Sequence, residues 1–281
     1  MPELAAPPGL LPLYLKAAAT TPLHRGGDTL PDSVYTLTDQ TIDRERLAAF
    51  QQVCGYRVAD VLPPTYLHVL AFPLSVALMT EPAFPFPLVG MVHVANAITL
   101  TRAVGADETV SFRVRAAELR PHAAGRQFDL LADATVDGDV VWSARSTYLR
   151  RGKPSGDAKS EQRPELAPQA GAVSVVRVPG DIGRRYGAVS GDRNPIHLHK
   201  MTAKAFGFPS AIAHGMWLKA RTLAALEGRL PDAYDVDVAF KTPLLLPATV
   251  AIATAAEGDG WALDVRNQRS GKPHLTGTIR R

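Results

Sequence analysis

The sequence predicts an α+β protein in which one helix-and-sheet unit is built twice. In each half a helical pattern ends in glycine, at Phe50–Gly55 and again at Tyr186–Gly191, and the two stretches align residue by residue. Each half also carries an aromatic residue ten positions before a turn glycine, Phe128 before Gly138 and Trp261 before Gly271. A helix-then-strands unit that appears twice favours one sheet wrapped around one helix, duplicated, with the two sheets side by side as a pseudo-dimer.

Length and composition are typical of a soluble globular protein. The chain has 281 residues, of which 46% are hydrophobic and 21% charged, enough for two domains that each bury a core. The single cysteine, Cys54, excludes an internal disulfide and fits a reducing cytosol. The N-terminus lacks the pattern of a secretory signal, and the most apolar stretch, Leu67–Met79, is too short to span a membrane. We therefore expect a cytoplasmic protein with no membrane segment.

The charge balance bears on the partners of the protein. The formal net charge is +4 and the isoelectric point is 9.3, which mildly favours anionic partners. No dense cluster of Lys and Arg with interleaved aromatic residues is present, so nucleic acid is not an expected partner.

Residues 1–150 are expected to form the first domain. Pro73 lies inside its longest apolar stretch and should kink that helix or end its first part. Asp137-Gly138 is a hairpin signal between two strands. The expected helices are Leu11–Ala19, Ile42–Cys54 and Tyr66–Met79, and the expected strands are Val34–Thr38, Met91–Leu100, Thr109–Val114, Phe128–Val136 and Val140–Tyr148.

Residues 151–170 are polar and contain proline, which is typical of a linker, and residues 171–281 should form the second domain. The second domain repeats the plan of the first. Its expected helices are Ile182–Val189 and Ala211–Leu230, and its expected strands are Val173–Val178, Asp235–Phe240, Thr249–Ala255, Trp261–Gln268 and Leu275–Arg280.

The candidate chemistry lies directly after the first helix of the second half. Ser190-Gly191 ends that helix, and Asn194-Pro195 then disfavours helix at position 194, so a tight turn should expose Asp192 and His197. A carboxylate and an imidazole held by stiff backbone can share one water and move protons at neutral pH. Taken singly, each residue is also an ordinary turn former.

A candidate oxyanion donor follows. Gly215 stands at the head of an apolar helical stretch, where backbone N–H groups have no acceptor within the helix. A base, an acid and an oxyanion donor are the three parts that addition of water to a conjugated thioester requires.

These residues resemble the motif of the MaoC-like, or (R)-specific enoyl-thioester hydratase, family. The matching positions are Tyr186, then Ser190-Gly191-Asp192-x-Asn194-Pro195-x-His197, then Ala213-His214-Gly215. The whole chain, including its Leu-Pro-Leu-Tyr-Leu-Lys-Ala-Ala lead-in, is similar to the two-domain 3-hydroxyacyl-thioester dehydratases of actinobacteria. The resemblance implies a double hotdog fold and reversible dehydration of (3R)-hydroxyacyl thioesters of coenzyme A or acyl carrier protein.

The resemblance also implies the residue roles. Asp192 and His197 would be catalytic, and the Gly215 amide would form the oxyanion hole. Substrate positioning falls to four residues, Tyr186, Ser190, Asn194 and His214. No metal and no cofactor is expected. The molecule would be a monomeric pseudo-dimer or a homodimer of double hotdogs. His199 departs from the family pattern, in which many members carry Asp, and should affect support of the loop more than the chemistry.

The internal repeat indicates which half is active. Continuing the alignment past Gly55 places Tyr56 opposite Asp192 and Val61 opposite His197, so the first half lacks both groups. Its segment before the core helix is also much shorter. We expect the first half to be non-catalytic and its apolar helix to shape a groove for the acyl chain.

Three alternatives remain open on the sequence. Asp192, His197, His199 and His214 offer plausible metal ligands, although the two rings of His-x-His often point to opposite sides. A thioesterase on the same fold and a non-catalytic acyl-thioester binding module are the others. A serine hydrolase has little support, because the chain has no Gly-x-Ser-x-Gly elbow.

Overall fold

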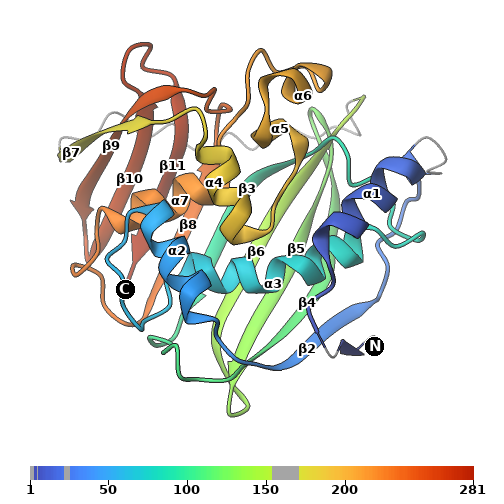
Figure 1. Cartoon of the computed structure of the whole chain (residues 1–281), viewed down its shortest axis with the longest axis horizontal. Helices are drawn as coiled ribbons and strands as arrows, with labels where there is room; N and C mark the ends of the chain where they lie inside the picture. Colours follow the sequence, from blue (N-terminus) through green and yellow to red (C-terminus); the bar gives the residue numbers. More distant parts are fainter. Residues whose placement is uncertain (1–2, 5, 22–25, 154–170) are drawn as a thin grey trace.

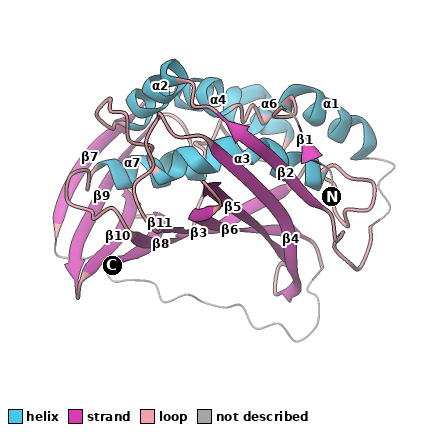
Figure 2. Ribbon diagram, turned by 90° about the horizontal axis from the view of Figure 1, so that it is seen from below, coloured by secondary structure: helices cyan, strands magenta, loops and turns pink. Residues whose placement is uncertain are grey.

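The computed structural model describes residues 3–4, 6–21, 26–153 and 171–281. Its described strands form one sheet of eleven strands in the order β1-β2-β4-β5-β6-β3-β8-β11-β10-β9-β7 (Figure 1). The helices gather on one face of the curved sheet (Figure 2). The architecture is a double hotdog, as predicted: each half is an antiparallel sheet curved around its own central helix.

The first half runs from the N-terminus to β6. All of its predicted strands are present, and most of them extend a few residues further than predicted, because strand patterns weaken at polar ends that the ladder still pairs. Its elements are β1 (Glu3–Leu4), α1 (Leu10–Thr20), β2 (Val34–Gln40), α2 (Arg44–Cys54), α3 (Pro64–Met79), β3 (Met91–Leu100), β4 (Val110–His122), β5 (Gly125–Val136) and β6 (Asp139–Arg151).

The second half repeats this plan with additional short helices. Its elements are β7 (Ala172–Val178), α4 (Ile182–Ser190), α5 (Pro195–Leu198), α6 (Lys200–Ala205), α7 (Gly215–Ala224), β8 (Tyr234–Phe240), β9 (Ala248–Glu257), β10 (Gly260–Asn267) and β11 (Pro273–Arg280). The strand order β2-β4-β5-β6-β3 in the first half is mirrored by β7-β9-β10-β11-β8 in the second.

The two halves join through an antiparallel pair at the centre of the sheet. β3 pairs with β8 from Ala95 opposite Ala239 to Leu100 opposite Tyr234, so the two five-stranded units become one sheet. This pairing is the pseudo-dimer that the duplicated pattern predicts. It places the two central helices, α3 and α7, side by side above one continuous surface (Figure 2).

The aligned glycines of the repeat occupy equivalent positions. Gly55 ends α2 with a φ of 82°, and Gly191 ends α4 with a φ of 80°. This left-handed conformation favours glycine, which explains why the sequence places glycine at both helix ends. The helices that they end lie against each other, with the rings of Phe50 and Tyr186 at 6.0 Å.

The two central helices correct the predicted boundaries. α3 is continuous from Pro64 to Met79, so Pro73 does not end it. The predicted helix Ala211–Leu230 is shorter at both ends and spans Gly215–Ala224. Its first residues are extended instead, because Ala213 donates to the Leu244 carbonyl at 2.9 Å, and Leu246 donates back to the Ala211 carbonyl at 2.8 Å. These tertiary bonds outweigh the helical pattern of the sequence.

Side chains from each half bond to the backbone of the other. The Arg46 guanidinium donates to the carbonyl of Val189 at 2.8 Å, and the Trp217 indole donates to the carbonyl of Val53 at 3.0 Å. Lys219 is fully buried on α7, and its ammonium group lies 2.6 Å from the side-chain oxygen of Asn96 on β3. These contacts fix the second-half helices on the first-half scaffold.

Two sequence predictions are affected by the described range. Most of the predicted linker, residues 154–170, lies outside the described residues, while Arg151 still belongs to β6. The domain boundaries therefore stay predictions.

Among the helices that the structure describes, none is both long and apolar enough to cross a membrane.

Candidate active site

Asp192 is held by the end of helix α4. Gly191 turns the chain out of the helix, and the Asp192 N–H then donates to the Ser190 hydroxyl oxygen at 3.2 Å. The same hydroxyl donates to the Tyr186 carbonyl at 2.8 Å. Ser190 thus links the first residue of the turn to the last turn of the helix, which holds the backbone of Asp192 in place.

His197 lies on a one-turn helix, where the sequence predicted a turn alone. The Asn194 side chain caps that helix, α5, because its oxygen accepts the Ile196 N–H at 3.4 Å, and Pro195 takes the first helical position. The sequence correctly excludes helix at position 194. It did not reveal that the next four residues close a single helical turn, which points His197 back toward Asp192.

The tautomer of His197 follows from its surroundings. Its Nδ1 lies 2.8 Å from the carbonyl oxygen of Ile212, and a carbonyl only accepts, so Nδ1 carries the proton. Burial lowers the pKa of this buried ring below its usual value. His197 is therefore neutral at neutral pH, with the Nε2 lone pair available as a base.

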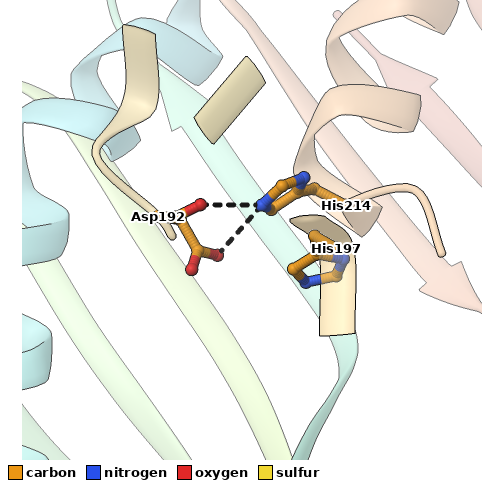
Figure 3. A group of neighbouring side chains, drawn as sticks. All are labelled: Asp192, His197 and His214. Carbon is orange, nitrogen blue, oxygen red and sulfur yellow. Dashed lines mark hydrogen bonds and ion pairs between the residues drawn. The ribbon is translucent and has the colours of Figure 1, made fainter. Parts of the chain in front are cut away.

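His214 stacks on His197. The two ring centroids are 3.6 Å apart with an interplanar angle of 26°. His214 Nε2 donates to the backbone carbonyl of Asp192 at 3.0 Å and lies 3.7 Å from its carboxylate oxygen Oδ2 (Figure 3). Burial lowers the pKa of His214 to about 3, so this ring is also neutral, and it locks the two catalytic candidates together.

The Asp192 carboxylate has one bonded oxygen and one open oxygen. Its Oδ1 accepts the Tyr14 hydroxyl at 2.7 Å and the Asn194 N–H at 3.2 Å. Within the described residues, no hydrogen bond reaches Oδ2. Burial would raise the pKa of this carboxyl group, but the rings of His214 and His197, the Tyr14 hydroxyl and the Asn194 N–H outweigh it and lower the pKa. Asp192 is therefore ionised at neutral pH.

Gly215 is the first residue of α7, directly after His214. Its N–H stands at the positive end of the helix dipole, where no acceptor exists within the helix. A β-carbon at this position would lie 3.0 Å from the ring of Phe240 on β8. The close ring explains a glycine here, since a larger residue would push Phe240 away from the helix start.

The structure brings together most of the residues that the sequence singled out. One ligand atom each from Asp192, His197 and His214 lies within 4.8 Å of the others. The Tyr186 ring packs against His214 at 4.9 Å, and Ser190 and Asn194 hold the turn. His199 is exposed, between α5 and α6, so it is not part of the four-ligand metal set that the sequence suggested.

The first half also faces this site, through side chains that the sequence analysis did not single out. Besides Tyr14, the Asp192 charge acts on His68 of α3 and on His93 and Tyr148 of the sheet. The His93 ring stacks on Tyr148 at 4.6 Å and meets Phe240 at 5.1 Å. No local pattern identifies these residues, because only the pairing of β3 with β8 brings them near the second-half motif.

Comparisons with known proteins show which family the chain resembles. Residues 162–277 match the model of the MaoC like domain. The chain is 40% identical over 281 residues to 3-hydroxyacyl-thioester dehydratase X of Mycobacterium tuberculosis, covering 99% of both chains. A crystal structure of that mycobacterial protein, HtdX, superposes with a TM-score of 0.79 at 39% identity, covering 88% of this chain and 99% of the other.

More distant structures share the fold. A MaoC-like dehydratase from Phytophthora capsici superposes with a TM-score of 0.74 at 17% identity, covering 89% of this chain and 95% of that one. At this identity the likeness shows the double hotdog alone. On the full-length 40% identity, the chain belongs to the MaoC-like family of 3-hydroxyacyl-thioester dehydratases.

Proposed function

We propose that this protein is a hydro-lyase that reversibly dehydrates (3R)-hydroxyacyl thioesters to trans-2-enoyl thioesters, with Asp192 and His197 as its catalytic residues. One observation carries the proposal: Asp192 offers an ionised carboxylate and His197 a neutral imidazole, and a carboxylate oxygen and a ring nitrogen of the two lie within 4.8 Å of each other. Two hydrogen bonds of ordinary length span about that distance, so one water molecule can bridge the pair.

The hydration direction follows from this arrangement. The bridging water adds its oxygen to C3 of the enoyl group, and Asp192 or His197 takes its proton. A proton is delivered to C2 on the same face, so the elements of water are added and the pair returns to its starting state. Dehydration is the reverse path. General acid–base groups of this kind contribute ~10²–10⁴-fold to a rate.

The Gly215 N–H is the proposed donor to the thioester carbonyl. Negative charge develops on that oxygen when C3 is attacked, and an N–H at a helix start stabilises it without reorganisation. His214 supports the site, because it bonds to the Asp192 backbone and stacks on His197. Tyr186, Ser190 and Asn194 position the same turn.

The substrate class is an acyl thioester of coenzyme A or of acyl carrier protein. The basic character of the chain supports an anionic carrier of either kind. We further propose that the first half lines the acyl chain and carries out no chemistry of its own, and that the enzyme works in the cytoplasm. We propose that the protein is either one double hotdog or a dimer of two. Light scattering of the purified protein measures which of these states is present in solution.

The same fold also serves thioester hydrolysis, so the test must separate bond types. A panel of trans-2-enoyl-CoA substrates of increasing length is incubated with the protein. Loss of the conjugated enoyl absorbance without release of free thiol is the expected result, and chiral analysis should give the 3R product. Release of free coenzyme A at the same rate would support a thioesterase, and binding without turnover would support a non-catalytic module.

A further inference from the structure

Helix α1 places a tyrosine from the N-terminal lead-in on the catalytic carboxylate. Tyr14 lies 178 positions before Asp192 in the chain, and its hydroxyl donates to Asp192 Oδ1 at 2.7 Å. The helix is seated on the catalytic turn, since the Leu10 side chain lies so close that a β-carbon on Gly191 would come within 2.7 Å of it. α1 also packs beside α3, so both ends of the Tyr14 contact rest on fixed structure (Figure 1).

The contact gives the two carboxylate oxygens different environments. Oδ1 receives both the Tyr14 hydroxyl and the Asn194 N–H, whereas Oδ2 receives no hydrogen bond from the described residues. A carboxylate with two donors on one oxygen cannot rotate freely about its last bond without breaking them. Oδ2 is therefore held on the side of His214, whose Nε2 lies 3.7 Å away.

We infer that Tyr14 is a positioning residue for the proposed dehydration, which orients the Asp192 carboxylate so that Oδ2 meets the reacting water. This inference rests on the proposed function of Asp192. It makes the N-terminal lead-in a working part of an active site whose motif lies wholly in the second half.

Tyr14 acts as a donor and never as the base. Burial, together with the charge of Asp192, raises its pKa well above the usual value, so the hydroxyl keeps its proton. In return, its hydrogen bond lowers the pKa of Asp192. The titratable groups whose charge interacts with Asp192 are Tyr14, His68, His93, Tyr148, Tyr186, His197 and His214.

Tyr14→Phe removes the hydroxyl and keeps the ring. We expect kcat for a medium-chain trans-2-enoyl-CoA to fall about 10- to 100-fold, with KM changed by less than about twofold, because a charge-assisted hydrogen bond to the reacting group is lost. The acid limb of the pH profile of kcat/KM should move to higher pH, since the Asp192 carboxyl loses a donor that stabilises its ionised form. The melting temperature should change little.

The matched control is Tyr35→Phe. Tyr35 lies on β2 of the same half, and its hydroxyl interacts with the Glu81 carboxylate, away from Asp192. Like Tyr14→Phe, this variant loses a tyrosine hydroxyl that interacts with a carboxylate. It should keep the wild-type kcat and pH profile. A fluorotyrosine introduced at position 14 is a stronger donor, so it should move the acid limb the opposite way, to lower pH.

A second readout is independent of the substrate. Carbon-13 NMR of carboxyl-labelled aspartate, with the Asp192 signal assigned by its loss in Asp192→Asn, follows the titration of that group in the intact protein. Tyr14→Phe should raise its pKa, and Tyr35→Phe should not. If the wild type hydrates no enoyl thioester, the proposed function fails while this titration still decides the role of Tyr14. An unchanged kcat, or an acid limb and titration that do not move in Tyr14→Phe, would overturn the inference.

Discussion

In the two halves of this protein, equivalent helices end in the same way, and the chain then follows a different path in each half. α2 and α4 both end at a left-handed glycine, Gly55 and Gly191, and the two helices pack against each other. After Gly55 the chain reaches its central helix at Pro64, whereas after Gly191 it passes through α5 and α6 before Gly215. The candidate active site lies in that longer segment, between two helices that both halves share.

The difference separates the scaffold from the chemistry. The glycine cap, the central helix and the five-stranded sheet occur in both halves, so their presence alone does not distinguish the half that carries the proposed chemistry. Asp192 and His197 occur once, and so does the capped turn that orients them. The first half has instead buried aromatic and imidazole side chains that face this single site. On the proposed function, one half of the duplicated fold would hold the reacting groups and the other half would enclose them.

The largest effect is expected from the residues that have no counterpart in the first half. Asp192→Asn and His197→Asn should each lower kcat for a 2-enoyl thioester by ~10²–10⁴-fold, because each removes one member of the proposed acid–base pair. The circular dichroism spectrum should stay unchanged. Steady-state hydration kinetics measure the effect.

The matched control comes from the aligned position of the other half. Val61 is 53% exposed and stands opposite His197 in the repeat, so Val61→Asn should leave kcat unchanged. Normal turnover in either site variant with an intact fold would refute the assignment of the dyad. A loss of activity in the control would show that the comparison of the two halves is wrong.

Much of this comparison could be predicted from sequence, because it rests on local patterns. Glycine at both helix ends, the Asp137-Gly138 hairpin and the Asp192–His197 spacing are local signals, and the structure places each as a turn or helix end. The start of α7 was missed, because Ala211 and Ala213 form tertiary hydrogen bonds that no local pattern records. Tyr14 was missed as a site residue, since its partner is 178 positions away.

A second prediction tests whether the first half encloses the acyl chain. Ala71 and Ser75 of α3 are both almost fully buried, with 1% and 6% exposure. If the chain runs along this helix, Ala71→Trp and Ser75→Phe should lower kcat/KM about tenfold or more for long-chain enoyl thioesters and spare the shortest substrate. A chain-length series beside a melting curve measures both quantities.

The competing outcome is plain overpacking of a core. Inserting a large side chain into a core typically costs ~1–3 kcal/mol of stability and affects every substrate alike. Ala262→Leu supplies that reference, because Ala262 is fully buried on β10 of the other half. A uniform loss of activity with a lowered melting temperature, as expected of Ala262→Leu, would reject the groove.

The third prediction concerns the imidazoles that the first half buries. Burial lowers the pKa of His68 to about 4 and of His93 to about 3. An unfolded chain binds these protons near pH 6.5, so the unfolded state gains protons first as the pH falls. The contribution of these neutral rings to the free energy of unfolding is therefore fully present above about pH 6.5 and is lost as the pH falls toward 4 and 3. At pH 5 the loss is ~2 kcal/mol per ring.

One substitution isolates this effect. His93 Nε2 is buried and has no hydrogen-bond partner among the described residues, so His93→Phe removes the titrating group and keeps a stacked ring. Urea unfolding at pH 7 and pH 5 should show a smaller acid loss in this variant than in the wild type. His199→Gln, which removes an exposed imidazole, should keep the full loss. An equal acid loss in His93→Phe and the wild type would show that this ring does not titrate as its burial requires.

The smallest expected effect is that of metal removal, which decides whether the second half differs by a proton-transfer site or by a metal centre. Asp192, His197 and His214 have the right ligand types and lie close enough together to hold an ion. Imidazole lone pairs lie in the ring plane, however, and the two rings are stacked at 3.6 Å with a 26° tilt, which directs their lone pairs side by side and not to one point. We therefore expect exhaustive chelation to leave kcat unchanged, with less than stoichiometric metal by elemental analysis. A stoichiometric ion whose removal abolishes turnover, and whose return restores it, would make this turn a metal site and change what distinguishes the two halves.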